Sequence, residues 1–247
     1  MKAEVVLTVS ESKRLIAKGV ASLRFVQDKL EKGIIVVPSG STNAYIYEEL
    51  TGKAIDKRAY LAGRTWPAAN KPNWEVKSLP DLVLVDGVPS ADLDRFTALG
   101  EMKAGDVYIK GANALNYTAG VAGVSIGNPT GGTVGGSIGH IIGRKLRLLI
   151  PVGLEKEVPY DIVEASALLA SDEEQLGSVL SLFPIHGEIF TEIEALGIMF
   201  GVDAIPVAAG GIAGAEGGVR LLLLGEGDDV KDAVDFVESI QGEPPLI

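Results

Sequence analysis

The chain contains no cysteine and only two histidines, His140 and His186, among its 247 residues. Without cysteine it can form no disulfide, no thiolate metal site and no cysteine nucleophile. Two histidines cannot by themselves make an ordinary zinc site. We therefore expect a protein with no metal and no cofactor, whose chemistry depends on other side chains.

Positive charge is also scarce. The 22 Lys and Arg residues are outnumbered by 33 Asp and Glu residues, which gives a formal net charge of −11. Nucleic acids and anionic membranes are bound by basic faces, so this charge argues against both as general partners. A small anionic metabolite held in a local pocket remains compatible with it.

Long hydrophobic runs are absent, so no segment is expected to span a membrane. The first residues, Met1-Lys2-Ala3-Glu4, lack the pattern of a signal peptide, and a cytoplasmic protein is the default expectation. Hydrophobic residues make up 47% of the chain, which is enough for a sizeable core. The length fits one large domain or two ordinary ones.

Short apolar runs alternate with helix-like segments over the larger part of the chain. Runs without a polar face are typical of strands buried on both sides, so we expect a largely parallel, Rossmann-like α/β sheet with helices on both faces. Strands are predicted at 33–37, 58–62, 81–87, 106–111 and 146–152, helices from Ser10 to Gly33, from Ser41 or Thr42 to Gly52 and at 161–170, and a loop at 66–72.

The last part of the chain has a different character. Thr191 and Glu194 form a capping-box pattern that opens a helix. Two apolar strands at 204–209 and 219–224 follow, joined by a glycine-rich turn, and Asp228 or Asp229 is expected to cap a closing helix. The helix–strand–strand–helix order predicts a small α+β, ferredoxin-like domain.

We therefore predict two domains, a Rossmann-like ligand-binding domain at 1–176 and the small α+β domain at 177–247. A strand as apolar as 204–209 often faces another subunit, and this favours a homo-oligomer.

Three polar turns follow predicted strands, at 39–43, 86–94 and 110–116. In parallel sheets ligands bind at the carboxyl ends of the strands, so we expect these turns to share one edge. The first turn, Ser39-Gly40-Ser41-Thr42-Asn43, precedes a helix, whose unpaired N–H groups and dipole favour an anion. Simple capping by Ser41 or Thr42 explains the same residues.

Lys110 and Asp86 each end a predicted strand. An ammonium at the sheet edge can hold a carboxylate, phosphate or enolate, or can be an exposed charge. Asp86 has the chemistry of a base, of a sugar-hydroxyl ligand or of a partner for Lys110, and equally of a turn cap beside Gly87. The glycine-dense stretch 127–140 suits either a close approach to a ligand or a tightly packed loop, with Thr133 and Ser137 as further anion contacts. We expect His140 to be packed.

Taken in order, these motifs resemble those of ribose-5-phosphate isomerase A. The wider superfamily joins that enzyme with glucosamine-6-phosphate deaminases, the sugar-sensing domains of DeoR-type repressors, and CoA transferases. The family's Gly-Thr-Gly-Ser-Thr, Asp-Gly-Ala-Asp and Ile-Lys-Gly-Gly-Gly motifs are similar to Pro38-Ser39-Gly40-Ser41-Thr42, Asp86-Gly87-Val88-Pro89 and Ile109-Lys110-Gly111-Ala112-Asn113. A lysine after a later strand resembles Lys156.

The resemblance implies a sugar-phosphate site with Asp86 and Lys110 at the reacting end. The ligand-binding residues it implies are Ser39, Gly40, Ser41, Thr42, Asn43, Gly87, Gly111, Asn113 and Lys156.

Two family carboxylates have no counterpart. The second aspartate falls at Pro89, and the stretch 116–120, where the general-base glutamate belongs, has no acid. Aldose–ketose isomerisation needs such a base. Three functions therefore stay open: an isomerase-like enzyme with a modified mechanism, a non-catalytic metabolite sensor, and a CoA-ester transferase or hydrolase. No DNA-binding helix-turn-helix is visible, and the glutamate nucleophile that the CoA enzymes need is not found.

Overall fold

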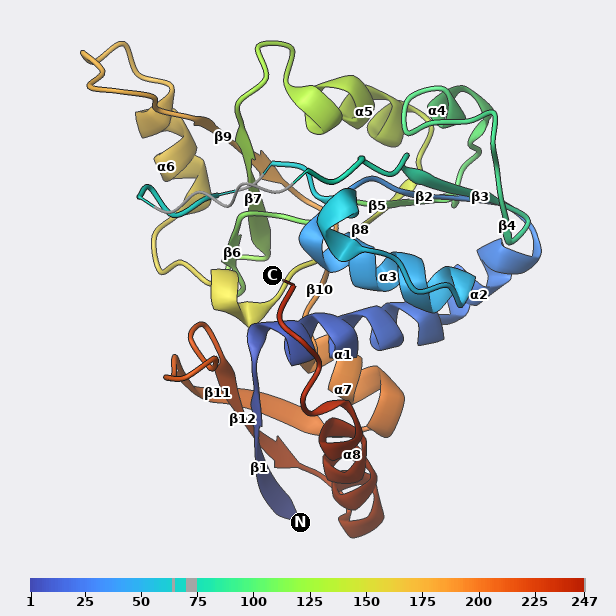
Figure 1. Cartoon of the computed structure of the whole chain (residues 1–247), viewed down its shortest axis with the longest axis vertical. Helices are drawn as coiled ribbons and strands as arrows, with labels where there is room; N and C mark the ends of the chain where they lie inside the picture. Colours follow the sequence, from blue (N-terminus) through green and yellow to red (C-terminus); the bar gives the residue numbers. More distant parts are fainter. Residues whose placement is uncertain (64, 70–74, 247) are drawn as a thin grey trace.

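The computed structural model describes residues 1–63, 65–69 and 75–246. It is a mixed α/β protein with one six-stranded mixed sheet and two three-stranded antiparallel sheets (Figure 1). The described helices are α1 (Val9–Ser22), α2 (Arg24–Glu31), α3 (Ser41–Thr51), α4 (Ala98–Glu101), α5 (Gly132–Gly143), α6 (Ile162–Leu169), α7 (Glu192–Phe200) and α8 (Gly227–Ile240), with 3-10 turns η1 (Lys57–Tyr60) and η2 (Leu154–Lys156). The described strands are β1 (Lys2–Leu7), β2 (Ile34–Val37), β3 (Leu82–Val85), β4 (Val88–Pro89), β5 (Val107–Ile109), β6 (Ala114–Asn116), β7 (Val121–Ile126), β8 (Arg147–Pro151), β9 (Ser181–Ile185), β10 (Glu188–Phe190), β11 (Asp203–Ala209) and β12 (Val219–Leu224).

The central sheet has the order β10-β8-β5-β2-β3-β4. The first four strands run parallel to one another, so their carboxyl ends meet at one edge. All residues of β2 and β5 are buried, as their apolar sequences predict. This shared edge positions the turns that follow β2, β5 and β8.

The third strand along the chain runs the other way. β3 pairs antiparallel with β2, Ile34 opposite Val85 and Val37 opposite Leu82. The start of β3 therefore lies at the edge where β2 ends, and the end of β3 lies at the opposite edge. The predicted meeting of three turns is wrong for the turn at residue 86.

Two local predictions also differ from the structure. Residues 57–60 form η1 rather than a strand, because the Asp56 side chain caps the turn by accepting from Arg58 N. The Tyr60 hydroxyl donates to Val37 O at the end of β2 and accepts from Leu82 N at the start of β3, which holds η1 against the sheet. The helix expected from Ser10 to Gly33 is two helices separated at Leu23, whose backbone is extended. Its first cap is Thr8, which forms a capping box with Glu11.

The helices and strands predicted near the end of the chain are confirmed. The Thr191–Glu194 capping box opens α7, and β11 pairs antiparallel with β12. The closing helix α8 begins after Glu226, so Asp228 and Asp229 lie in its first turn and do not cap it.

The sheets do not separate at residues 176 and 177. β1 comes from the start of the chain but pairs with β12, while β9 pairs with β7 and β10 with β8. Helix α1 lies between the two parts and packs against α3 on one side and α7 on the other (Figure 1).

Residues 66–69 of the predicted loop have no helix or strand, and residues 70–72 lie outside the described residues. In the part of the chain that the structure covers, no helix has the length and apolar character needed to cross a membrane.

Candidate functional site

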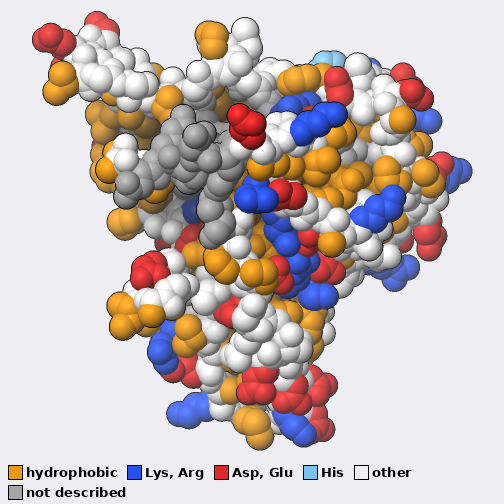
Figure 2. Space-filling view, in the orientation of Figure 1, with side chains coloured by type: hydrophobic (Ala, Val, Ile, Leu, Met, Phe, Trp, Pro, Cys, Tyr) orange, Lys and Arg blue, Asp and Glu red, His pale blue; other side chains and the backbone are white. Residues whose placement is uncertain are grey.

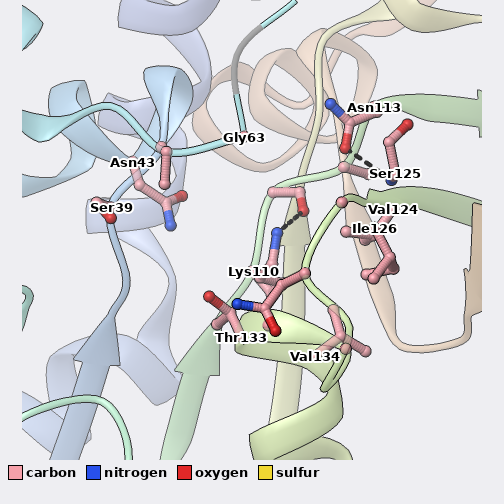
Figure 3. Close-up of a pocket in the computed structure, with 18 of the residues that line it drawn as sticks. Ser39, Asn43, Gly63, Lys110, Asn113, Val124, Ser125, Ile126, Thr133 and Val134 are labelled. Atoms are coloured by element: carbon pink, nitrogen blue, oxygen red, sulfur yellow. Dashed lines mark hydrogen bonds between the residues drawn. The ribbon is translucent and has the colours of Figure 1, made fainter. Parts of the chain in front are cut away.

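A cavity of about 590 Å³ lies at the edge of the central sheet where β2 and β5 end. Its walls come from the segments after β2, β5 and β8, from strand β7 and the loop after it, and from the start of α5 (Figure 3). The residues used below that line it are Ser39, Gly40, Ser41, Thr42, Asn43, Gly63, Arg95, Lys110, Gly111, Asn113, Asn128, Gly131, Gly132, Thr133, Val134 and Lys156.

The first wall is the N-terminus of α3, which no side chain caps. Its N-cap residue is Gly40, which has no side chain to accept a hydrogen bond, so Ser41 and Thr42 are first-turn residues and the predicted capping role is wrong. The first-turn N–H groups of Ser41, Thr42 and Asn43 have no partner within the helix. All three residues line the cavity, so this end of α3 offers hydrogen-bond donors and a positive dipole to the space inside.

Asn43 is held rigidly at this helix end. It is 2% exposed, and its amide nitrogen donates to Pro38 O at 2.7 Å and to Ile109 O at 3.2 Å. The two donations fix the orientation of the carboxamide, and within the described chain its Oδ1 has no hydrogen-bond partner. The site thus holds a buried acceptor whose desolvation a bound donor would offset.

The second wall is the N-terminus of α5, which is likewise uncapped. The N-cap Gly131 is left-handed, with φ of 80°, and offers no side chain. Gly131, Gly132, Thr133 and Val134 all line the cavity. Two helix N-termini therefore face one space, an arrangement that favours an anion.

The glycine-dense stretch lines the cavity at its start and packs closely further along. A Cβ at Gly135 would lie 2.3 Å from Thr130 O, and one at Gly136 would lie 2.4 Å from the Phe96 ring, so these glycines permit close packing. Ser137 is buried, donates to Thr133 O at 2.7 Å and does not line the cavity. His140, expected to be packed, is exposed.

Two lysines enter the cavity without a carboxylate partner. Lys110 Nζ donates to Gly111 O and Lys156 Nζ donates to Ala112 O, both at 2.8 Å. Within the described residues neither ammonium forms an ion pair, so both keep donors for a ligand. Burial, together with the nearby charges of Lys156 and Arg95, lowers the pKa of Lys110 to about 8.

Arg95 is a third cation in the cavity and was not foreseen from the sequence. Its Nε pairs with Asp81 at 2.6 Å and its guanidinium donates to Thr133 Oγ1 at 2.9 Å. Asp81 also accepts from Ser39 N at 2.8 Å, so this one carboxylate ties the turn after β2 to Arg95. Asp81 directly precedes the apolar run of β3. If β3 is taken to run antiparallel to β2, this position predicts a carboxylate at the edge where β2 ends.

Two further predicted residues line the cavity through the segment after β5. Asn113 accepts from Ser125 N at 3.0 Å, which fixes the segment to strand β7. Gly111 lies beside it, and its carbonyl is the acceptor for Lys110.

Asp86 and Gly87 lie elsewhere. The Asp86 carboxylate accepts from Gly33 N at 2.8 Å, at the start of β2, and so occupies the edge of the sheet opposite Lys110. Gly87 has φ of 76°, and a Cβ there would lie 2.7 Å from Leu30 O. Both residues shape the turn between β3 and β4.

A group of buried charges lies beside the cavity, around η2. Glu192 is fully buried and accepts a hydrogen bond from Leu154 N at 3.0 Å. Its pKa is raised to about 7, mainly by burial and secondly by the charge of Glu155. Burial lowers the pKa of Lys13, which is 8% exposed. η2 carries Lys156, so this group adjoins the cavity without lining it.

Among the described residues no Asp, Glu or His lines the cavity, and no three such side chains gather where they could hold a metal ion. The acidic side chains gather elsewhere: Figure 2 shows Asp and Glu over α8 at the lower end of the molecule. The local charge of the cavity is therefore positive in a protein whose net charge is −11.

Comparisons with protein-family models, with curated proteins and with solved structures found no match for the chain.

Proposed function

We propose that this protein binds a small phosphorylated metabolite, of the size and charge of a sugar phosphate, in the cavity at the ends of β2 and β5. The observation that carries the proposal is the convergence of two uncapped helix N-termini with Lys110, Lys156 and Arg95 on a space that no described carboxylate lines. Helix N-termini and cations are the groups that proteins use to hold phosphate.

The cavity also has features that suit the rest of a sugar phosphate. Asn43 Oδ1 is a buried acceptor for a ligand hydroxyl, and Asn113, Asn128 and Thr133 add polar side chains to the wall. A volume of about 590 Å³ falls within the range of pockets for small ligands.

A superfamily relationship to ribose-5-phosphate isomerase A, with its Rossmann-like sheet and ferredoxin-like domain, is part of the proposal. The order of the motifs after β2, β5 and β8 supports it. Isomerisation would need a modified mechanism, because no described carboxylate lines the cavity to shuttle a proton.

A non-catalytic metabolite sensor is the second candidate, and the same observation favours it: a binding cavity that lacks a general base. A CoA-ester enzyme would need a carboxylate nucleophile in this place, and the described lining supplies none.

We further propose that the protein is a homo-oligomer that pairs through β11. This strand is at the edge of its sheet, and its side chains Ile205 and Val207 are 44% and 48% exposed. Exposed apolar edge strands are sites where chains pair. A sedimentation experiment would give a dimer or larger species for the intact protein, and Val207→Lys would reduce its mass to that of the monomer.

The binding proposal is tested by calorimetry with sugar phosphates, and with inorganic phosphate as the minimal probe. Removing the ammonium in Lys156→Ala should weaken phosphate binding by about ten- to a hundred-fold, since a charge-assisted hydrogen bond contributes about 1.5–3 kcal/mol.

Lys53→Ala is the matched control, because this exposed lysine follows α3 at the end far from the cavity. Equal affinity in the wild type, Lys156→Ala and Lys53→Ala would contradict a phosphate site in this cavity.

A further inference from the structure

Lys110 has a position in the cavity that a phosphate clamp does not require. Figure 3 shows its side chain in the middle of the cavity, between Ser39 and Asn43 on one side and Asn113 and Ser125 on the other. The other donors of the proposed phosphate site are at the two helix N-termini and on Lys156 and Arg95. A ligand whose phosphate is held by those groups would present another part of its chain to Lys110.

We propose that Lys110 is a nucleophile that forms a Schiff base with a phosphorylated aldehyde or ketone bound in the cavity. The inference rests on the proposed phosphate site and names the substrate class of that site, a carbonyl compound.

The surroundings of Lys110 favour the neutral amine that such a reaction needs. Its pKa is lowered to about 8 by burial and by the charges of Lys156 and Arg95. No described carboxylate pairs with it to stabilise the ammonium. At pH 7 such a side chain is uncharged in about a tenth of the molecules, against about one in 2,500 for an ordinary lysine of pKa about 10.4. Lysines are activated as nucleophiles by desolvation and by neighbouring cations.

The step balances without any further reagent. The Nζ lone pair forms a bond to the carbonyl carbon, and the electrons of the C=O bond move to its oxygen, which takes a proton from nitrogen to give a carbinolamine. The oxygen then leaves as water with a second proton as the C=N bond forms. The net change is amine plus carbonyl to imine plus water.

Asn43 supplies an acceptor for this step. Its Oδ1 is buried and has no hydrogen-bond partner in the described chain, while its amide nitrogen is held by two carbonyls. Figure 3 shows the Asn43 carboxamide and the Lys110 ammonium turned toward the same space. An N–H of the amine or the hydroxyl of the carbinolamine would satisfy this oxygen.

The test uses the intact protein with two matched ligands. Dihydroxyacetone phosphate carries a phosphate and a ketone, and glycerol 3-phosphate carries the same phosphate without the carbonyl. Sodium borohydride reduces an imine to a stable secondary amine, which intact mass and peptide mapping then locate. We expect dihydroxyacetone phosphate to label Lys110 at least about ten-fold more than any other lysine, because only there is the amine both activated and beside a bound ligand. Glycerol 3-phosphate should give no adduct, and inorganic phosphate should suppress the labelling.

Two variants keep the charge and separate the roles. Lys110→Arg retains a cation but is not a nucleophile, so the adduct should be lost, whereas Lys53→Arg, at an exposed lysine far from the cavity, should keep it. If Lys110→Arg fails to fold, the peptide map of the wild-type protein still decides the outcome.

The possible outcomes are distinguishable. No adduct, or adducts spread evenly over surface lysines, overturns the Schiff base. Calorimetry with glycerol 3-phosphate is read separately: binding without an adduct leaves the phosphate site standing, and the absence of binding overturns the proposed function.

Discussion

At the scale of single residues, Lys110 and Lys156 enter the cavity without a described carboxylate partner, and a buried acid, Glu192, lies beside the cavity. Lys110 and Lys156 are held by backbone carbonyls, while Glu192 is buried beside η2 with a backbone N–H as its donor. The pKa of Lys110 is lowered and the pKa of Glu192 is raised, so measurements against pH report on these two groups.

The labelling of Lys110 should depend on pH with a midpoint near its pKa of about 8. A neutral amine is the reactive form, so the rate of borohydride trapping should rise about ten-fold between pH 7 and pH 9 and then level off. Lys156→Ala removes a neighbouring cation, so its midpoint should move to higher pH. A midpoint near pH 10.5 in the wild type would contradict an activated lysine.

Glu192 should make the protein less stable as the pH rises. Its pKa is about 7 in the folded chain, against about 4.3 when unfolded, so between these values the folded state binds more protons. Stability then falls with rising pH across this window, by on the order of 4 kcal/mol when the shift is taken in full. Of the charged groups near it, Glu155 contributes to the raised pKa of Glu192.

Glu192→Gln removes the titrating group and keeps its shape. Urea unfolding at pH 5, 6 and 7.5 should show a falling midpoint in the wild type and a nearly constant one in the variant. Parallel pH profiles for the two proteins would show that Glu192 is ionised in the folded state at all three values.

At the scale of helices and strands, the N-terminus of α3 has a glycine at its N-cap and no capping side chain among the described residues. Gly40 has φ of 174°, an extended conformation that any residue adopts, and a Cβ there would lie 3.8 Å from Asn43 Cβ, an ordinary contact. A capping residue would fit at this position, so the glycine is not a steric requirement.

Gly40→Asp should therefore separate stability from binding. An aspartate N-cap should leave the melting temperature equal or higher, by a few tenths of a kcal/mol in unfolding free energy. It should weaken phosphate binding by about ten-fold or more, since the carboxylate would accept from the first-turn N–H groups of α3 and repel the phosphate. Gly40→Asn is the control with a neutral cap, and it should lose less affinity. A Gly40→Asp protein that binds phosphate as well as the wild type would show that the end of α3 is not part of the site.

The strand sequences show why part of this site could be predicted and part could not. The apolar runs at β2, β5 and β8 identify buried strands, and the polar turns after β2 and β5 identify Ser39–Asn43 and Lys110. Lys156 is indicated only by the family resemblance. The apolar run at β3 does not indicate whether the strand is parallel or antiparallel to its neighbours, because a strand buried on both faces has no polar pattern. Its antiparallel pairing brings Asp81 and Arg95 to the cavity and removes Asp86.

At the scale of the whole molecule, the two ends of the chain are joined into one structure. β1 completes the sheet of β11 and β12, and β9 and β10 complete sheets of the earlier part. Arg14 on α1 pairs with Glu48 and Glu49 of α3 and with Glu243 near the C-terminus. Contacts between residues so distant in sequence leave no local signal, so the sequence predicts a boundary at 176 and 177 that the strand pairing does not follow.

A fragment of residues 1–176 should consequently not fold as an independent domain. It lacks β10 beside β8 and β9 beside β7, and it leaves β1 without its partner β12. We expect circular dichroism to show reduced structure and no cooperative thermal transition, with the full chain as control. A sharp transition in the fragment, with phosphate binding retained, would instead support the predicted two-domain division.

The most direct test of the phosphate site is the NMR spectrum of the backbone amides during titration with glycerol 3-phosphate. We expect the largest shifts at the first-turn amides of α3 and α5, Ser41, Thr42, Asn43, Thr133 and Val134, because these N–H groups would bind the phosphate. Shifts confined to other surfaces, or none at saturating ligand, would contradict the site.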